Sequence, residues 1–157
     1  MKGRNKKTVI FDLDGTLANI SKRRALANLP NGKIKWEVFF NPQHIPLDEP
    51  NGSVIAVLKA MKNDGYGIAI FSGRSDRTKE ATIKWLKKHD VPYDFLKMRP
   101  QNEEFAYMPD EKLKRVWLKQ FYPDKNEIQV VFDDRQKVVD MWRSEGLNCF
   151  QVAPGNF

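Results

Sequence analysis

Two aspartates separated by a single residue follow a short apolar run near the start of the chain. The run Thr8-Val9-Ile10-Phe11 is typical of a buried strand, and Asp12-Leu13-Asp14-Gly15-Thr16 comes directly after it. In an extended chain, side chains two residues apart lie on the same side, so the carboxylates of Asp12 and Asp14 are expected to be neighbours. Such a pair repels unless a positive charge lies between the two groups. Mg²⁺ held by oxygen atoms is the usual cation beside phosphate groups, and we expect it here.

The same pair suits phosphoryl transfer. The Asp12 carboxylate can attack phosphorus as a nucleophile and form an acyl phosphate, which divides one hard step into two. Asp14 can protonate the leaving oxygen and then activate water as a general base. The structural alternative is an Asp-rich turn that only closes a strand, and the motif alone does not exclude it.

Three further polar features follow in the order that a phosphate site would need. Ser72-Gly73 comes after a second apolar run, where a hydroxyl and backbone N–H groups can hold phosphate oxygens. Lys112 lies in the first turns of an expected helix, where an ammonium can balance the transferring group, and Lys114 is close enough to take that role instead. Asp133-Asp134 follows another apolar run. Each feature has an ordinary structural alternative. Ser72 could simply cap a helix, Lys112 could be a solvated lysine, and Asp133-Asp134 could cap the next helix.

The elements that must position these residues alternate between strands and helices. Strands are expected at 8–11, 67–71, 93–98, 127–132 and 148–152. Helices are expected after Ser53, after Asp76, from Pro109-Asp110 and before Gly146; in the third of these, Leu113, Val116 and Trp117 are expected to face inward. This alternation predicts an α/β fold, a Rossmann-like parallel sheet of about five strands with helices on both faces. Ligands of such sheets bind beyond the carboxyl ends of the strands, where Asp12, Ser72 and Asp133 fall.

The whole chain, residues 1–157, is interpreted as a single domain. The segment from about 18 to 50 is rich in Lys, Arg, Asn and Pro and contains Trp36, Phe39 and Phe40. It is expected to form a small insertion of one or two short helices near the mouth of the site. Packing of the three aromatic side chains into a small core is favoured over base stacking by Trp36.

Composition and charge narrow the setting of the protein. The formal net charge is +7, which favours polyanionic partners such as nucleic acid but also fits a basic soluble protein. Basic residues gather near the first motif: Arg4, Lys6, Lys7, Lys22, Arg23, Arg24, Lys33 and Lys35. No apolar stretch is long enough for a membrane span, so no membrane contact is expected. The single cysteine, Cys149, fits a reducing compartment, and a cytoplasmic location is expected.

The motif set resembles the haloacid dehalogenase superfamily, in its phosphatase branch. The matching residues are Asp12, Asp14, Ser72, Lys112, Asp133 and Asp134. Within that superfamily the chain is most similar to the 3′-phosphatase domains of phage polynucleotide kinase/phosphatases. The run from Phe132 to Arg143, the segment Ser72-Gly73-Arg74 and the residues from Cys149 to Phe157 carry that likeness.

The resemblance implies a sheet ordered 5-4-1-2-3 with only a small cap. It also implies Mg²⁺ held by Asp12, by the backbone carbonyl of Asp14 and by the Asp133-Asp134 pair. Thr16, Gly73, Arg74 and Arg23 would then bind the substrate phosphate. The family has an acidic residue shortly before its lysine, and Asp110 precedes Lys112 by two positions, which is closer than expected.

Three hypotheses for function follow. The first is removal of the 3′-phosphate from DNA or RNA ends, with a separate kinase or ligase as a candidate partner, because this chain has no GxxxxGK[ST] loop. The second is a 5′- or 3′-nucleotidase acting on mononucleotides, and the third is a non-catalytic binder of nucleic-acid ends. Neither the choice between DNA and RNA nor the oligomeric state can be read from these residues.

Overall fold

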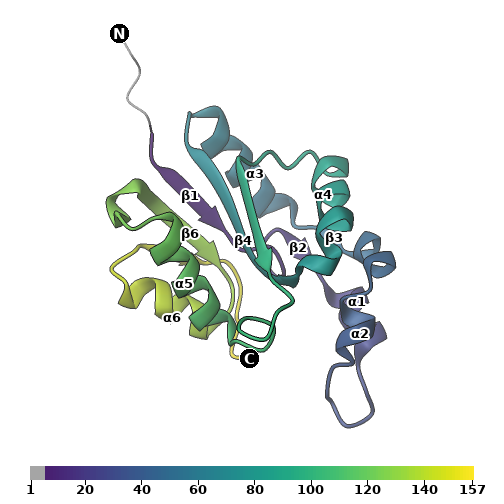
Figure 1. Ribbon diagram of the computed structural model, residues 1–157. Helices are drawn as coiled ribbons and strands as arrows, with labels where there is room; N and C mark the ends of the chain where they lie inside the picture. The colour runs from purple at the N-terminus through teal and green to yellow at the C-terminus, as the bar shows by residue number, and fades with distance from the viewer. Residues whose placement is uncertain (1–5) are drawn as a thin grey trace.

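The computed structural model describes residues 6–157, and its main sheet has five parallel strands (Figure 1). The strands of this sheet are β1 (Thr8–Phe11), β4 (Gly67–Ser75), β5 (Phe95–Arg99), β6 (Ile128–Asp133) and β7 (Cys149–Gln151). They lie in the order β5-β4-β1-β6-β7, which is the predicted order 5-4-1-2-3 when these five are numbered along the chain. All neighbouring pairs are parallel, so the predicted Rossmann-like α/β fold is confirmed.

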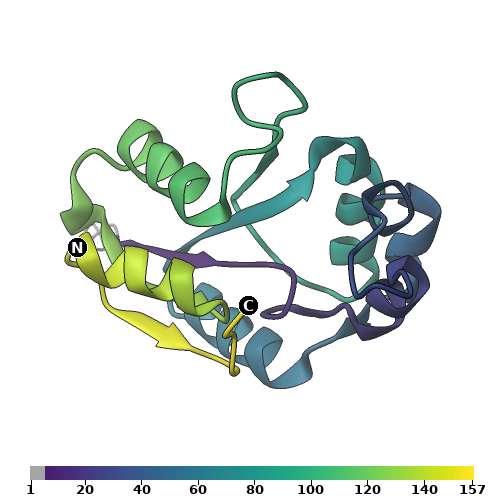
Figure 2. The same ribbon diagram turned by 90° about the horizontal axis from the view of Figure 1, so that it is seen from below.

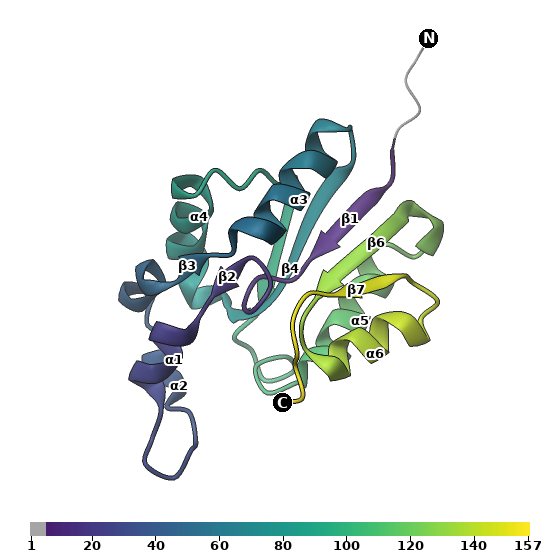
Figure 3. The same cartoon turned by 180° about the vertical axis from the view of Figure 1, so that it is seen from behind.

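Helices cover both faces of the sheet, and each face has its own apolar core. Figure 3 shows the sheet from behind, with α3 (Gly52–Asn63) and α4 (Lys79–Lys88) on one face. Their buried side chains Val54, Leu58 and Trp85 join one core with Val9 and Phe11 of β1. On the other face, α5 (Asp110–Phe121) and α6 (Gln136–Ser144) lie side by side and bury Trp117 and Trp142 in the second core.

The segment expected as an insertion stands at the end of the sheet where β1 ends, to one side of α5 and α6 (Figure 2). It consists of β2 (Ala18–Asn19), α1 (Ser21–Ala27), α2 (Trp36–Phe39), a 3-10 helix at Pro42–Leu47 and β3 (Glu49–Pro50). β2 and β3 pair as a two-stranded antiparallel sheet. The extent of the single domain stays a prediction. No helix within residues 6–157 combines the length and the apolar character that crossing a membrane would require.

Candidate active site

A cavity of about 1110 Å³ opens at the carboxyl ends of β1, β4 and β6. Parallel strands bring these ends to one edge of the sheet, which is why residues far apart in sequence meet there. The predicted site residues that line the cavity are Asp12, Asp14, Gly73, Arg74, Asp133 and Asp134. Thr16, Arg23, Ser72 and Lys112 are not among the lining residues. The sequence therefore located the cavity, but several of the predicted substrate contacts do not face it.

Three carboxylates form the floor of the cavity. Asp12, Asp133 and Asp134 are buried and each offers an oxygen atom within 4.8 Å of the others. Burial and the negative charge of Asp133 raise the pKa of Asp12 well above its ordinary value, although Lys114 opposes the rise. Carboxylate oxygens are the ligands that Mg²⁺ prefers, and one ammonium cannot balance three carboxylates, so these residues fit a divalent cation. The carboxylate of Asp14 lies outside this group, which leaves only its backbone carbonyl for the predicted metal contact.

The lysine of the site is Lys114, and the choice of Lys112 was wrong. The Lys114 Nζ donates to Asp12 Oδ1 at 2.7 Å and to Asp133 Oδ2 at 3.0 Å, while Lys112 lies exposed on α5. The two carboxylates raise the pKa of Lys114 even though burial disfavours its charge. Val116, expected to face inward, is 37% exposed; residues four apart share a helix face, so Lys112 faces solvent with it.

Asp14 is held by two buried arginines that were expected to bind the substrate phosphate. Arg23 Nη2 donates to Asp14 Oδ1 at 3.0 Å, and Arg74 Nε donates to the same oxygen at 2.7 Å. Both guanidinium groups also donate to the buried carboxylate of Asp48. The side chains of Arg23 and Arg74 are fully buried, so their donors are already used within the protein. Arg74 lines the cavity and Arg23 does not, and their contact with the substrate phosphate stays a prediction.

This network sets the protonation of Asp14. Burial would raise the pKa of Asp14, but the charges of Arg74 and Arg23 outweigh it and hold that pKa below its ordinary value. For Asp48, burial is the stronger effect and raises the pKa, despite the hydrogen bonds from the same arginines. Asp14 is thus ionised here, which suits a general base, and it must leave the arginines to carry a proton as an acid.

Two hydroxyl groups predicted to serve the substrate are turned toward the protein instead. Thr16 Oγ1 donates to Asp12 Oδ2 at 3.2 Å, so it orients Asp12. Ser72 is fully buried and its Oγ accepts from the Arg74 N–H at 3.1 Å. The residue that caps the next helical turn is Ser75, whose Oγ accepts from Arg77 N–H. Because β4 continues to Ser75, the strand ends later than the apolar pattern indicated, and Ser72 lies below the rim.

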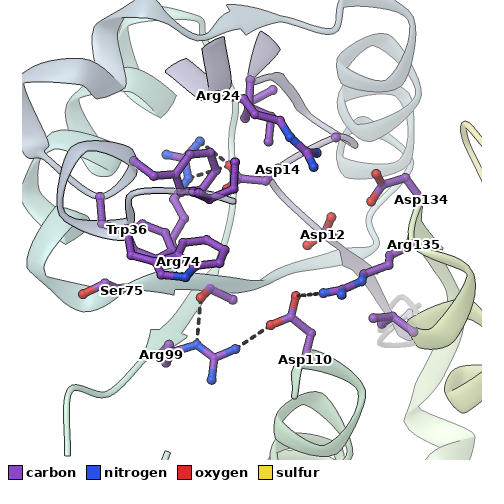
Figure 4. A pocket seen from close by; sticks show the side chains of 18 of the residues that line it. Asp12, Asp14, Arg24, Trp36, Arg74, Ser75, Arg99, Asp110, Asp134 and Arg135 are labelled. Carbon is purple, nitrogen blue, oxygen red and sulfur yellow. Dashed lines mark hydrogen bonds and ion pairs between the residues drawn. The ribbon is translucent and has the colours of Figure 1, made fainter. Parts of the chain in front are cut away.

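A second ionic group, which the sequence interpretation missed, lies on the α5 side of the cavity. Figure 4 shows Asp110 between Arg99 and Arg135, and Arg135 Nη1 donates to Asp110 Oδ2 at 3.1 Å. Arg99 also donates to the backbone oxygens of Gly73 and Met108, which fixes the loop before α5. Asp110 and Lys114 are one helical turn apart, a spacing that could have identified the lysine. Arg99 ends β5, so the strand-end rule pointed to it, whereas no sequence signal pointed to Asp48.

Most of the basic cluster near the first motif does not reach the cavity. Arg4 lies outside the described residues, and Lys6 pairs with Asp64 at the opposite end of β1. Lys22 pairs with Glu49. Of the cluster's residues that the structure describes, Arg24 alone lines the cavity.

Comparison with known proteins gives the family. Residues 6–157 match the family of the polynucleotide kinase PNKP phosphatase domain. The chain is 32% identical over 139 residues to a protein of Autographa californica nuclear polyhedrosis virus whose name describes a bifunctional polynucleotide kinase/RNA ligase. That match covers 87% of this chain and 18% of the viral protein, so the chain spans under a fifth of the length of this relative.

Solved structures agree with this assignment. A chain of the Pnkp1/Rnl/Hen1 complex is 35% identical with a TM-score of 0.80, covering 99% of this chain and 48% of that one. The haloacid dehalogenase-like hydrolase SP0104 from Streptococcus pneumoniae matches at 15% identity with a TM-score of 0.64, over 94% of this chain and 84% of that one, which shows the fold. The chain is a haloacid dehalogenase-like phosphatase domain and belongs to the family of polynucleotide kinase PNKP phosphatase domains.

Proposed function

We propose that this chain removes the 3′-phosphate from DNA or RNA ends through a phospho-aspartate at Asp12, with Mg²⁺ as cofactor. The observation that carries the proposal is the position of Asp12 in an open cavity, between Lys114 and Thr16 and two residues before a second carboxylate. Lys114 donates to Asp12 Oδ1 and Thr16 donates to Asp12 Oδ2, so the carboxylate proposed as nucleophile has a fixed orientation. The names of two similar proteins, a polynucleotide kinase/RNA ligase and a chain of an RNA repair complex, support nucleic acid as substrate.

The reaction has two steps that this chain's residues can perform. A carboxylate oxygen of Asp12 bonds to phosphorus as the bond from phosphorus to the 3′ oxygen breaks. Asp14, after leaving the arginines and taking up a proton from solvent, gives that proton to the 3′ oxygen. Water then attacks the phosphorus, Asp14 takes a proton from it, and the bond between Asp12 and phosphorus breaks to release inorganic phosphate. Mg²⁺, held by Asp12, Asp133, Asp134 and the Asp14 carbonyl, would offset the negative charge of the phosphoryl group. Lys114 supplies further positive charge to the same group.

The openness of the cavity supports a polymer end over a mononucleotide. The insertion contributes only short elements, and the cavity is bordered by α2 and by the loop between β5 and α5. A strand of nucleic acid can leave such a cavity, whereas a nucleotidase is expected to enclose its substrate. A separate kinase or ligase remains the proposed kind of partner, since the name of the viral relative describes a polynucleotide kinase/RNA ligase.

Phosphate release tests the proposal. The purified chain should release phosphate from 3′-phosphorylated DNA or RNA in the presence of Mg²⁺, less well as salt rises, and far less from 5′-phosphorylated ends or mononucleotides. Asp12→Asn should abolish release, while Asp140→Asn, an exposed aspartate on α6 outside the cavity, should retain it. Faster turnover of mononucleotides would favour the nucleotidase hypothesis. Binding without any release would favour the non-catalytic hypothesis, and full activity of Asp12→Asn would exclude the phospho-aspartate.

A further inference from the structure

One tryptophan of this chain is placed differently from the other three. All four tryptophans lie within the described residues, and Trp85, Trp117 and Trp142 are at most 3% exposed. Trp36 is 60% exposed and lines the same cavity as Asp12. A tryptophan that is more than half exposed gains less from packing than a buried one, so packing alone does not account for the position of Trp36.

The indole of Trp36 rests on a rigid base. It stacks on Phe40 with ring centroids 5.6 Å apart and an interplanar angle of 17°, and it meets Phe39 edge-on. Phe39 is buried, with the Arg23 guanidinium 4.3 Å from its ring centre, and its backbone oxygen accepts from Arg23 Nη1. The three aromatic side chains pack against one another as the sequence predicted, with Phe39 buried at the base of the group and Trp36 exposed at its surface. Through Arg23, this platform is joined to Asp14.

Free positive charge lies on the rim of the same cavity. Arg24 and Arg77 are exposed lining residues, and neither forms an ion pair with a carboxylate within residues 6–157. The carboxylates on the cavity floor, Asp12, Asp133 and Asp134, are the ones that fit a metal ion, so they do not pair with these arginines. Unpaired guanidinium groups beside an exposed aromatic ring are the combination that binds single-stranded nucleic acid, with phosphates on the charges and a base on the ring.

We propose that Trp36 stacks on a base of a single-stranded 3′ end while Asp12 receives its terminal phosphate, with Arg24 and Arg77 contacting phosphodiester groups. This inference rests on the proposed function, because it assumes that the phosphorylated end is a nucleic acid. It assigns α2 as the element that recognises a base. Stacking is tolerant of base identity, so the subsite selects for a strand with bases and not for a sequence.

Fluorescence tests the stacking directly. Because the other tryptophans are buried, Trp36 is the tryptophan that a bound base can quench. In the inactive Asp12→Asn protein, a 3′-phosphorylated oligonucleotide should quench the tryptophan emission. The same oligonucleotide with abasic residues at its last positions should quench it much less. Trp36→Phe in that background should lose the quenching but keep binding. Equal quenching by the normal and the abasic oligonucleotide would overturn the proposal, whether or not the wild-type protein proves active.

Kinetics provides the second test, with a matched control. Trp36→Ala should raise KM for the 3′-phosphorylated oligonucleotide roughly tenfold and leave KM for the abasic oligonucleotide unchanged. Trp36→Phe should bring KM for the normal oligonucleotide most of the way back to the wild-type value. Phe150→Ala removes an aromatic ring that is 58% exposed on β7 and lies outside the cavity. This variant should leave KM for both oligonucleotides unchanged. If the wild type releases phosphate and Trp36→Ala equals it on both substrates, the stacking is wrong and the proposed function stands. If the wild type releases none, the proposed function fails.

Discussion

At the scale of single residues, the site uses its charges in two separate groups. Lys114 joins Asp12 and Asp133, and the two arginines join Asp14 and Asp48. The proposed nucleophile, Asp12, and the proposed acid/base, Asp14, therefore have different partners although only Leu13 separates them. This division lets the pKa of Asp12 rise and that of Asp14 fall in one cavity.

Replacing the lysines of α5 separates the buried ammonium from its exposed neighbour. Lys114→Ala should lower kcat roughly a hundredfold or more, because it removes the ammonium that contacts the nucleophile. Lys112→Ala, two residues away on the exposed face, should stay close to the wild type. Steady-state phosphate release measures both variants, and circular dichroism checks that each is folded. Equal activity of the two variants would contradict the assignment of Lys114.

At the scale of elements, the strand ends carry the chemistry and glycines make room for it. Gly15, directly after the nucleophile loop, has φ of +81°, and a Cβ there would lie 2.1 Å from Asp134 Oδ2. Gly73 at the end of β4 is similarly close to Asp110, with 2.6 Å from a Cβ to Oδ1. These glycines allow the backbone to approach carboxylates that face the cavity.

Gly15→Ala tests this close approach, and Gly146→Ala is its matched control. Gly146 follows α6 with φ of +84° and has open space around it, so alanine there brings only the backbone cost of about 1–2 kcal/mol. Gly15→Ala should have that same cost and should also displace Asp134, lowering activity at saturating Mg²⁺ roughly tenfold or more. Thermal unfolding and phosphate release, measured side by side, distinguish the two effects. A Gly15→Ala protein with normal activity would show that Asp134 can move without consequence.

The sequence predicted elements better than it predicted which side chains face the cavity. Apolar runs were sufficient for the strands and helices of the sheet, because burial and alternation are local properties. The strand order and the set of metal-binding aspartates were implied by the resemblance to the haloacid dehalogenase superfamily. The pairing of Arg23 and Arg74 with Asp48 was not predictable, since it depends on how the insertion folds against β4. Lys112 and Lys114 both lie in the first turns of α5, and the choice of Lys112 did not use the buried face of that helix to separate them. Helical spacing from Asp110 or from the buried Trp117 and Leu118 would have favoured Lys114.

At the scale of the whole molecule, charge is distributed unevenly. The chain has a formal net charge of +7, yet three carboxylates meet at one buried point. Among residues 6–157, Lys114 is the one cation that forms an ion pair there, with Asp12 and Asp133. Asp12 follows β1, while Asp133 and Asp134 lie at the end of the adjacent strand β6. A cation bound there joins the two central strands of the sheet and relieves their repulsion, so it should stabilise the whole fold.

Mg²⁺ should therefore raise the midpoint of thermal unfolding. At a hundredfold excess over Kd, binding to the folded state alone contributes about 2.7 kcal/mol, or roughly 5 to 10 °C for a chain of this size. Burial and the charge of Asp133 raise the pKa of Asp134, so its ionised form is disfavoured in the folded protein. Asp134→Asn should consequently be at least as stable as the wild type in EDTA and should lose most of the Mg²⁺ shift. Asp140→Asn should keep that shift in full. A wild type whose midpoint does not respond to millimolar Mg²⁺, or an Asp134→Asn variant that responds equally, would show that these carboxylates do not hold the ion.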